Sequence, residues 1–285
     1  METTLKSAGK SVVISPKKPT VLIGERINPT GKKRLAAALT EGNLDIVRQE
    51  AEAQVEAGAD VLDVNVGAAG VDEVDLLPKA VRLVMETVDV PVCIDSADVD
   101  ALRAALAVHR ELAPQGKPLI NSVNGEEARL KQVLPLVAEY KTAVIGLTMD
   151  DEGIPDTPER RLAVARKIVE RAEGLGIPRE DVVIDCLALT VGADSRAGVV
   201  SLGAMRMVRE ELGVNMTVGA SNISFGLPDR EVINWAFLAM AIQNGLNCPI
   251  VDAGVVRPAI LAADLILGRD DYAMRYIKAY KKRAK

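Results

Sequence analysis

Short apolar runs rich in β-branched residues recur along the chain, and most of them end on polar or small residues. Eight such runs lie between residues 20 and 254. Because they are continuously apolar rather than alternating, they are typical of parallel strands that are buried on both faces. The runs are TVLIGER (20–26), DVLDVNVG (60–67), PVCIDS (91–96), PLINSVN (118–124), AVIGLT (143–148), VVIDCLAL (182–189), NMTVGASN (215–222) and CPIVDAG (248–254).

The segments between these runs have the periodicity of amphipathic helices. In residues 44–59 the apolar positions fall on or near one helical face, and the pattern ends at Gly58. Another pattern begins after Thr157, a good N-cap residue, with Pro158 at the first helical position. Residues 126–140 and 229–245 fill two other gaps in the same way.

Eight strands that alternate with helices, without a break in composition, predict one (β/α)₈ TIM barrel. We expect the barrel to span residues 20–285, and we expect residues 1–19 to form an N-terminal arm, as a leader strand or a loose segment. A doubly wound open sheet is the alternative, because alternation alone does not show that a sheet closes. The first strand is followed by INPTG, without the G-x-G-x-x-G of a dinucleotide site, which disfavours that alternative.

Net charge, apolar stretches and cysteine positions restrict the partners and the compartment expected for this protein. The formal net charge is -5, and no basic stripe offsets it, which argues against a nucleic-acid partner. No apolar stretch approaches the ~18 residues that a membrane span requires, and the N-terminus lacks the apolar core of a signal peptide. Cys93, Cys186 and Cys248 each lie in an apolar run without metal-site spacing. Reduced, buried thiols in a cytoplasmic protein are therefore expected.

Polar side chains stand at the end of nearly every predicted strand, where a barrel carries its active site. Turn formation and helix capping explain about half of them. They explain less well Asp63, Asp95 and Asp185, which follow directly on buried apolar residues and need hydrogen-bond donors that a ligand can supply. The full set is Glu25, Asn28, Asp63, Asn65, Asp95, Asn121, Asn124, Thr148, Asp185, Ser221, Asn222 and Asp252.

The chemistry of this ring is one-sided. His109, the only histidine, falls in a helical pattern remote from any strand end, which excludes a histidine-based triad and disfavours a histidine-ligated metal. A carboxylate-bound Mg²⁺ is a weaker alternative, and we expect no metal. The predicted strand ends offer many hydrogen-bond acceptors and amides and little fixed positive charge. Such a site suits a neutral heterocycle that carries several hydrogen-bond donors. One aspartate can accept from an amino group and an adjacent ring N–H together.

Seven of these motifs carry a resemblance to a known family. In matching order over about residues 20–267, the chain resembles the pterin-binding barrel family, which includes dihydropteroate synthase, and most closely its methyltetrahydrofolate:corrinoid methyltransferases. The motifs are IGERIN (23–28), LDVNVG (62–67), CIDS (93–96), INSVNGE (120–126), IGLTMD (145–150), IDCL (184–187) and GASNISFG (219–226).

The resemblance implies a role for each matching position. Asp95, Asn121 and Asp185 match residues that hydrogen-bond the pterin ring, and Asn222 matches the residue at N5, which bears the methyl group. Asn222 and Asp95 are the expected catalytic residues. An arginine at the start of a helix, Arg230, is a candidate for the anionic folate tail, although such an arginine is as often ordinary surface. The loop lining and polar floor of the pocket match Gly219, Ser221, Glu25, Asp63 and Asn65.

The expected reaction is transfer of the N5 methyl group between methyltetrahydrofolate and the cobalt of a corrinoid. The chain has no Asp-x-His-x-x-Gly segment, so the corrinoid is expected on a separate small protein, in O-demethylation or acetogenic one-carbon metabolism. Family members are commonly homodimers. Because the chain lacks the family's Arg-x-His after the last strand, dihydropteroate synthase is a weaker alternative; a folate-binding module without turnover is another.

Overall fold

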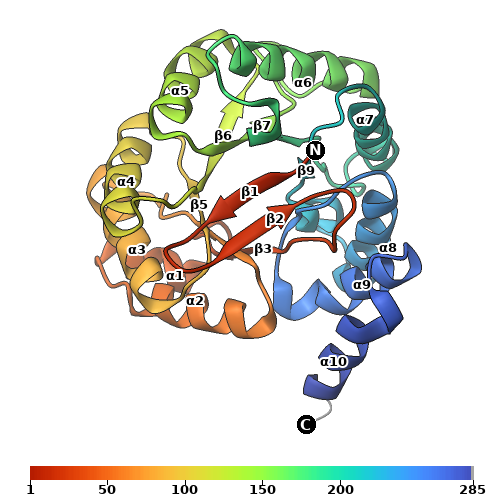
Figure 1. Cartoon of the computed structure of the whole chain (residues 1–285), viewed down its shortest axis with the longest axis horizontal. Helices are drawn as coiled ribbons and strands as arrows, with labels where there is room; N and C mark the ends of the chain where they lie inside the picture. The colour runs from red at the N-terminus through yellow and green to blue at the C-terminus, as the bar shows by residue number, and fades with distance from the viewer. Residues whose placement is uncertain (284–285) are drawn as a thin grey trace.

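The computed structural model describes residues 1–283 and contains one eight-stranded parallel sheet ringed by helices (Figure 1). Every run predicted as a strand forms one. The order β10-β3-β4-β5-β6-β7-β8-β9 follows the chain around the ring, and a bridge between Gly219 and Ile250 joins its two ends. The amide of Ile250 donates to the carbonyl of Val218 at 2.9 Å at this junction. The predicted barrel is therefore confirmed, and the open-sheet alternative is wrong.

The barrel strands are short and parallel. Their bounds are β3 (Ile23–Ile27), β4 (Val61–Val64), β5 (Val92–Asp95), β6 (Leu119–Asn124), β7 (Ala143–Leu147), β8 (Val182–Asp185), β9 (Met216–Thr217) and β10 (Ile250–Val251).

Two helix ends lie where the sequence predicts them. Gly58 terminates α2 in a left-handed conformation with φ of 103°. The hydroxyl of Thr157 accepts from the amide of Arg160 to cap α6, with Pro158 as its first residue. The helices are α1 (Lys33–Thr40), α2 (Asp45–Ala57), α3 (Glu73–Thr87), α4 (Val99–Leu112), α5 (Glu127–Tyr140), α6 (Pro158–Glu173), α7 (Ala197–Glu211), α8 (Arg230–Gln243), α9 (Ala253–Ile266) and α10 (Met274–Arg283).

Residues 1–19 form an ordered hairpin rather than a loose arm. Strands β1 (Thr3–Lys6) and β2 (Ser11–Ile14) pair antiparallel and cross one end of the barrel (Figure 1). Lys6 bridges Lys117, which precedes β6, so the hairpin covers the N-terminal ends of the strands. Leu5 and Ile14 are fully buried in the cluster that fills the barrel interior.

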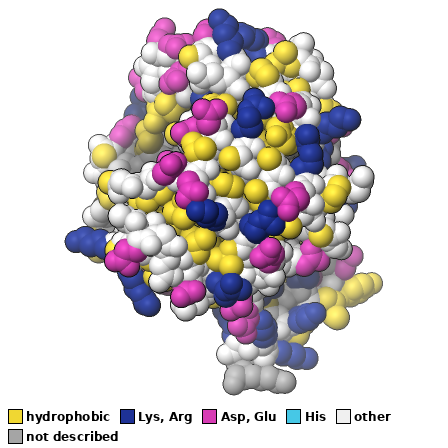
Figure 2. Space-filling model, turned by 90° about the vertical axis from the view of Figure 1, so that its left-hand side faces the viewer, with side chains coloured by type: hydrophobic (Ala, Val, Ile, Leu, Met, Phe, Trp, Pro, Cys, Tyr) yellow, Lys and Arg dark blue, Asp and Glu magenta, His cyan; other side chains and the backbone are white. Residues whose placement is uncertain are grey.

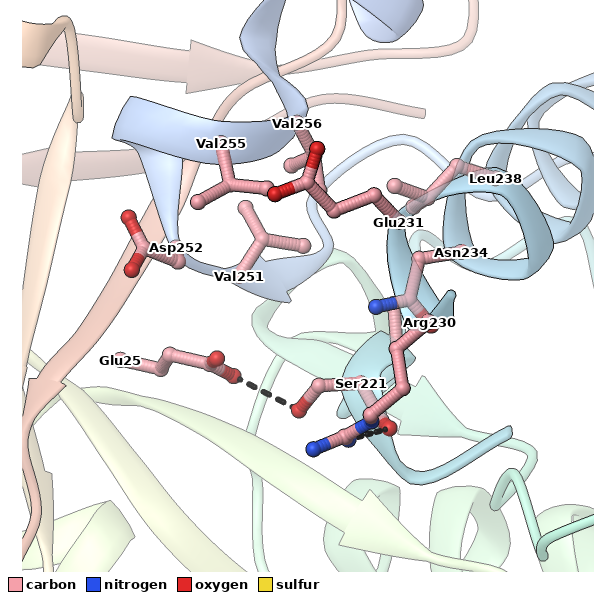
Figure 3. A pocket seen from close by; sticks show the side chains of 11 residues that line it. Glu25, Ser221, Arg230, Glu231, Asn234, Leu238, Val251, Asp252, Val255 and Val256 are labelled. Carbon is pink, nitrogen blue, oxygen red and sulfur yellow. Dashed lines mark hydrogen bonds between the residues drawn. The ribbon is translucent and has the colours of Figure 1, made fainter. Parts of the chain in front are cut away.

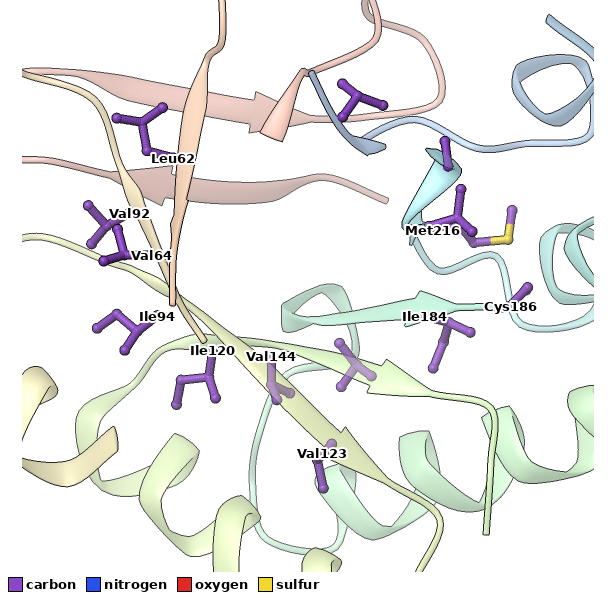
Figure 4. Close-up of a cluster of buried hydrophobic side chains, with 14 of the residues drawn as sticks. Leu62, Val64, Val92, Ile94, Ile120, Val123, Val144, Ile184, Cys186 and Met216 are labelled. Carbon is purple, nitrogen blue, oxygen red and sulfur yellow. The ribbon is translucent and has the colours of Figure 1, made fainter. Parts of the chain in front are cut away.

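Side chains alternate between the interior and the helix layer, as strand geometry requires. Val61 points into the barrel, whereas Leu62 and Val64 pack outward under the helices (Figure 4). The interior cluster at the level of Val61 also contains Cys93. The next inward position along these strands is polar, so the interior becomes hydrophilic toward the C-terminal end.

The side of the molecule drawn in Figure 2 carries a mixture of basic and acidic side chains. Arg82 of α3 pairs with Glu111 at 2.8 Å, and Arg103 of α4 pairs with Glu139 at 2.9 Å. All three cysteines are buried and free, as expected. Across residues 1–283, no helix combines the length and the apolar character that crossing a membrane demands.

Candidate active site at the barrel mouth

The predicted polar residues converge because parallel strands end at one rim. Register places Asp95 of β5 beside Asn121 of β6, and Asp185 of β8 beside Thr217 of β9. Asp63 pairs in register with Cys93, one inward level below Asp95. The barrel thus brings residues separated by more than 120 positions in the sequence to one mouth.

Asp63, Asp95 and Asn121 form a hydrogen-bonded cluster. The Asn121 amide donates to Asp63 Oδ1 at 3.1 Å, and the two carboxyl groups contact each other. Burial raises the pKa of Asp63 well above its usual range, and repulsion from Asp95 adds to the shift. Burial also raises the pKa of Asp95 to about 6, against a hydrogen bond from Asn65 that lowers it. The charge of Asp95 therefore opposes ionisation of Asp63.

Asp185 forms a second acceptor on the opposite side of the ring. Its Oδ1 accepts from the backbone amide of Leu187 at 2.7 Å, and the amide of Gly219 also donates to the carboxylate. These bonds hold the side chain in one orientation. Burial nevertheless raises its pKa to about 6, because few water molecules reach the charge. A ligand with N–H donors would favour the ionised form.

The 3-10 turn η2 (Ala220–Ser224) carries Asn222 at the end of β9. A Cβ atom at Gly219 would stand 3.1 Å from Asn222 Nδ2, so glycine gives this amide room to lie over the turn. The Asn222 side chain is exposed and bonds to no other side chain or backbone group among residues 1–283. Its donor and acceptor are both available to a ligand. Ser221 Oγ donates to Glu25 Oε2 at 3.2 Å and ties the turn to β3.

Glu25 lies inside the mouth, as predicted, and burial raises its pKa. Asn65 turns its side chain toward both its own loop and Asp95. Arg230 is at the start of α8 and bonds the turn η2: Nε donates to Ser224 Oγ at 3.0 Å and an Nη donates to the Ser221 carbonyl at 2.7 Å. The observed contacts of Arg230 are therefore with the loop that carries Asn222.

Three cations that sequence reasoning missed hold the loops at the mouth. Lys32 donates to two carbonyls within β3 and one just after it, each at 3.1 Å. Arg129 donates to two carbonyls that follow β5 and to one within β6. Arg161 is 1% exposed and donates to the carbonyls of Cys186 and Leu187, both at 2.6 Å. A signal was present for Arg161, since it shares the buried face of α6 with the apolar residues Leu162 and Ala165.

A side cavity of about 220 Å³ opens beside the mouth, between α8 and α9 (Figure 3). Glu25 and Ser221 line it on the side of the barrel, and Asn234, Leu238 and Val256 line it on the side of the helices. Over the described residues, no group of three or more histidine, cysteine or acidic side chains is placed to hold a metal ion.

Comparison with known proteins identifies the family. The sequence profile described as "Pterin binding enzyme" matches residues 24–252, from the second residue of β3 to the residue after β10. The chain belongs to the pterin-binding enzyme family. Solved structures of family barrels superpose over nearly the entire chain. Dihydropteroate synthase from Yersinia pestis, with a pterine-sulfa conjugate, has a TM-score of 0.70 at 18% identity over 93% of this chain and 99% of that one.

Two curated relatives are more similar in sequence. The methylcorrinoid:tetrahydrofolate methyltransferase of Eubacterium limosum is 32% identical over 92% of this chain and 96% of that protein. Methionine synthase of Mycobacterium leprae is 32% identical over 90% of this chain, which corresponds to 22% of that longer protein. The dihydropteroate synthase structures are only 15–22% identical to this pterin-binding enzyme, so the structural likeness to them shows its fold and nothing further.

Proposed function

We propose that this pterin-binding enzyme transfers the N5 methyl group between methyltetrahydrofolate and the cobalt of a separate corrinoid protein. The proposal is carried by one observation. Hydrogen-bond acceptors line the barrel mouth, and an amide side chain without a hydrogen-bond partner stands at its rim. Asp95, Asn121 and Asp185 form the walls, and the unpaired amide of Asn222 stands beside them. The methylcorrinoid:tetrahydrofolate methyltransferase relative, similar over almost its full length, supports the same activity.

In this proposal the walls recognise the pterin ring. Asp185 accepts from the amino group and an adjacent ring N–H, and Asp95 and Asn121 bond the opposite edge, with Asp63 and Asn65 behind them. Gly219 and Ser221 let the planar ring approach the turn, and Glu25 completes the polar floor. Buried carboxylates that lack water benefit most from such donors, because a charge-assisted hydrogen bond replaces lost solvation.

The chemical step needs positive charge at N5. A methyl group on a tertiary amine transfers poorly, since the departing nitrogen anion is very basic. Asn222 can accept from N5–H when that nitrogen is protonated and can donate to its lone pair otherwise. Because burial raises the pKa of both Asp63 and Asp95, a proton held by this pair would serve as a reservoir for the network. The reduced cobalt supplies the electron pair that forms the cobalt–carbon bond, and the electrons of the broken carbon–nitrogen bond stay on N5.

The folate tail and the partner complete the proposal. Arg230 uses only some of its N–H groups on the turn, so its exposed edge can meet the tail carboxylates. The corrinoid protein docks over the mouth, and the pathway is O-demethylation or acetogenic one-carbon metabolism in the cytoplasm. A homodimer would bury the exposed apolar side chains of α8 and α9, which include Trp235, Met240 and Ile266.

An anaerobic assay tests the proposal. The enzyme is mixed with methyltetrahydrofolate and cob(I)alamin, and the loss of Co(I) absorbance and the gain of tetrahydrofolate are followed together. One-to-one conversion is expected. Tight folate binding without conversion would instead support a binding module. Condensation of a pterin diphosphate with p-aminobenzoate, in the absence of methyl transfer, would establish a synthase.

A further inference from the structure

The side cavity beside the mouth has polar groups at its rim and aliphatic walls behind. Leu238 of α8 meets Val255 and Val256 of α9 at the back. Glu25 and Ser221 line both this cavity and the mouth, so the two spaces are adjacent (Figure 3). A group about the size of a short side chain, attached to a molecule seated over the mouth, would fit a volume of about 220 Å³.

Asn234 is the unusual member of the cavity wall. Its side chain is 8% exposed, and its Oδ1 is fully buried without a hydrogen-bond partner in the described part of the chain. Figure 3 shows its amide nitrogen turned toward the enclosed space and its oxygen turned away from it. Among residues 1–283, no acceptor meets that nitrogen. A polar atom at the wall of a partly enclosed space is costly unless water or a ligand completes its hydrogen bonds. The nitrogen that faces the cavity therefore calls for an acceptor, which a carbonyl on the incoming group would supply.

The charges around the cavity restrict that group further. Glu25, Glu231 and Asp252 line the cavity, against the single cation Arg230, whose guanidinium is bonded to η2. The three carboxylates outnumber this cation and disfavour an anion inside the cavity, so the folate tail would meet the exposed edge of Arg230 outside it. The described residues also offer no cluster fit for a metal. A neutral group with N–H donors and a short apolar stem matches both the rim and the aliphatic back wall.

We propose that this cavity receives a primary carboxamide side arm of the corrinoid, with Asn234 as the specificity-determining residue. The inference rests on the proposed function, which brings a corrin ring over the mouth. Corrin rings carry carboxamides on short alkyl stems around their edge. The carbonyl of the arm accepts from Asn234 Nδ2, and the carboxylates of the rim accept from its N–H groups. The arm thereby fixes the rotation of the corrin above N5.

The test compares two corrinoid probes that differ in their arms. Dicyanocobinamide has intact amides, whereas heptamethyl cobyrinate carries esters that accept but do not donate. Dissociation constants are measured by equilibrium dialysis with tetrahydrofolate present, for the wild type, for Asn234→Leu, and for Asn244→Leu at the far end of the same helix. Isothermal titration with methyltetrahydrofolate alone is the parallel measurement.

The wild type and Asn244→Leu should prefer the amide probe by about tenfold, a typical value for one or two net hydrogen bonds. Asn234→Leu should bind the amide probe about tenfold more weakly and reduce this preference, because the carbonyl of the arm is no longer held where its N–H groups reach the rim. It should retain folate affinity and melt no lower than the wild type, because a buried oxygen without a partner has been removed. Equal binding of both probes by the wild type, or no binding of either, would overturn the inference. Weaker folate binding by Asn234→Leu would assign the cavity to the folate instead. Absence of folate binding in the wild type would refute the proposed function itself.

Discussion

At the scale of single residues, the aspartates at the mouth are held in an environment that opposes their charge. Burial raises the pKa of both Asp95 and Asp185 to about 6. A raised folded-state pKa means that the fold favours the protonated carboxyl. The contribution of each group to stability is therefore full below about pH 4 and is lost as the pH rises through about 6. A ligand that donates hydrogen bonds to the carboxylates reverses this preference.

Folate affinity should therefore increase with pH. Between about pH 5 and pH 7 the dissociation constant for methyltetrahydrofolate should fall, because below pH 6 Asp185 must lose a proton before it accepts two N–H bonds. Titration calorimetry in two buffers of different ionisation enthalpy would count the protons released. Asp185→Asn should weaken binding at pH 7 and reduce the pH dependence, whereas Asp100→Asn on the surface of α4 should do neither. A pH-independent affinity of the wild type would contradict the assignment.

Asn222 should matter for the chemical step more than for binding. Asn222→Ala should lower kcat for methyl transfer by about 10²-fold, the loss typical of removing one group that stabilises developing charge. Its folate dissociation constant should change much less, since the wall residues remain. Stopped-flow absorbance of cob(I)alamin measures the rate, and Asn244→Ala serves as the control. An equal loss in both quantities would indicate a role in ground-state binding instead.

A rate that is flat between mild acid and neutrality would argue against proton delivery to N5 through the mouth network. The network proposed for this delivery includes Asp63 and Asp95, and the pKa of Asp95 of about 6 falls inside that interval. A pH–rate profile under single-turnover conditions is the relevant measurement, because it separates the transfer step from product release.

At the scale of elements, lysine and arginine side chains donate hydrogen bonds to backbone carbonyls and so fix the loops that carry the site. Arg161 of α6 donates to carbonyls at the start of the loop after β8, and its Nε donates to the Pro155 carbonyl in the loop before α6 at 2.9 Å. Burial lowers the pKa of Arg161. The position of Asp185 at the end of this strand thus depends on a helix that contacts no ligand in our proposal.

Arg161→Met should destabilise the protein by about 3 kcal/mol or more, because two buried carbonyls and a partly buried one lose their donor. The midpoint of urea unfolding measures the loss. Its neighbour Arg160, which is exposed and pairs with exposed Glu152, provides the matched control. Arg160→Met should change stability by less than about 0.5 kcal/mol. Similar effects of the two substitutions would refute the role of Arg161.

At the scale of the whole molecule, the N-terminal hairpin closes the end of the barrel opposite the site. Ile14 is fully buried in the interior cluster, whereas Val13 on the other face of β2 is half-buried. The hairpin shields the interior cluster from water at the N-terminal ends of the strands. The site residues stand at the other end, so barrel stability and chemistry are separated in space, as is typical of this architecture.

Ile14→Ala should therefore cost about 2–5 kcal/mol of stability and leave the kcat of methyl transfer near the wild-type value at a temperature where the fold persists. Calorimetry of thermal unfolding and the cobalt assay give the two readouts. Val13→Ala should cost clearly less. A large loss of activity in a folded Ile14→Ala protein would show that the hairpin and the mouth are coupled.

Local patterns in the sequence were enough to predict the eight strands, several helices with their caps, and the polar strand ends. Strand and helix periodicity depends on neighbouring residues, and Gly58 or Thr157 acts within one turn of its own position. Parallel strands end at one rim, so the position of Asp95, Asn121 and Asp185 at a common mouth followed once a barrel was assumed.

Tertiary structure alone decided closure and the partners of each polar group. The bond from Ile250 to Val218, the contact of Asp63 with Asp95, and the three carbonyls around Arg161 join residues that are distant in sequence or lie in different elements. Hydrophobic periodicity carries no record of such pairings, because it reports which face of an element is buried and not what covers it. The raised pKa values of Asp63 and Asp95, the buried cation Arg161 and the unpartnered oxygen of Asn234 are consequences of that packing.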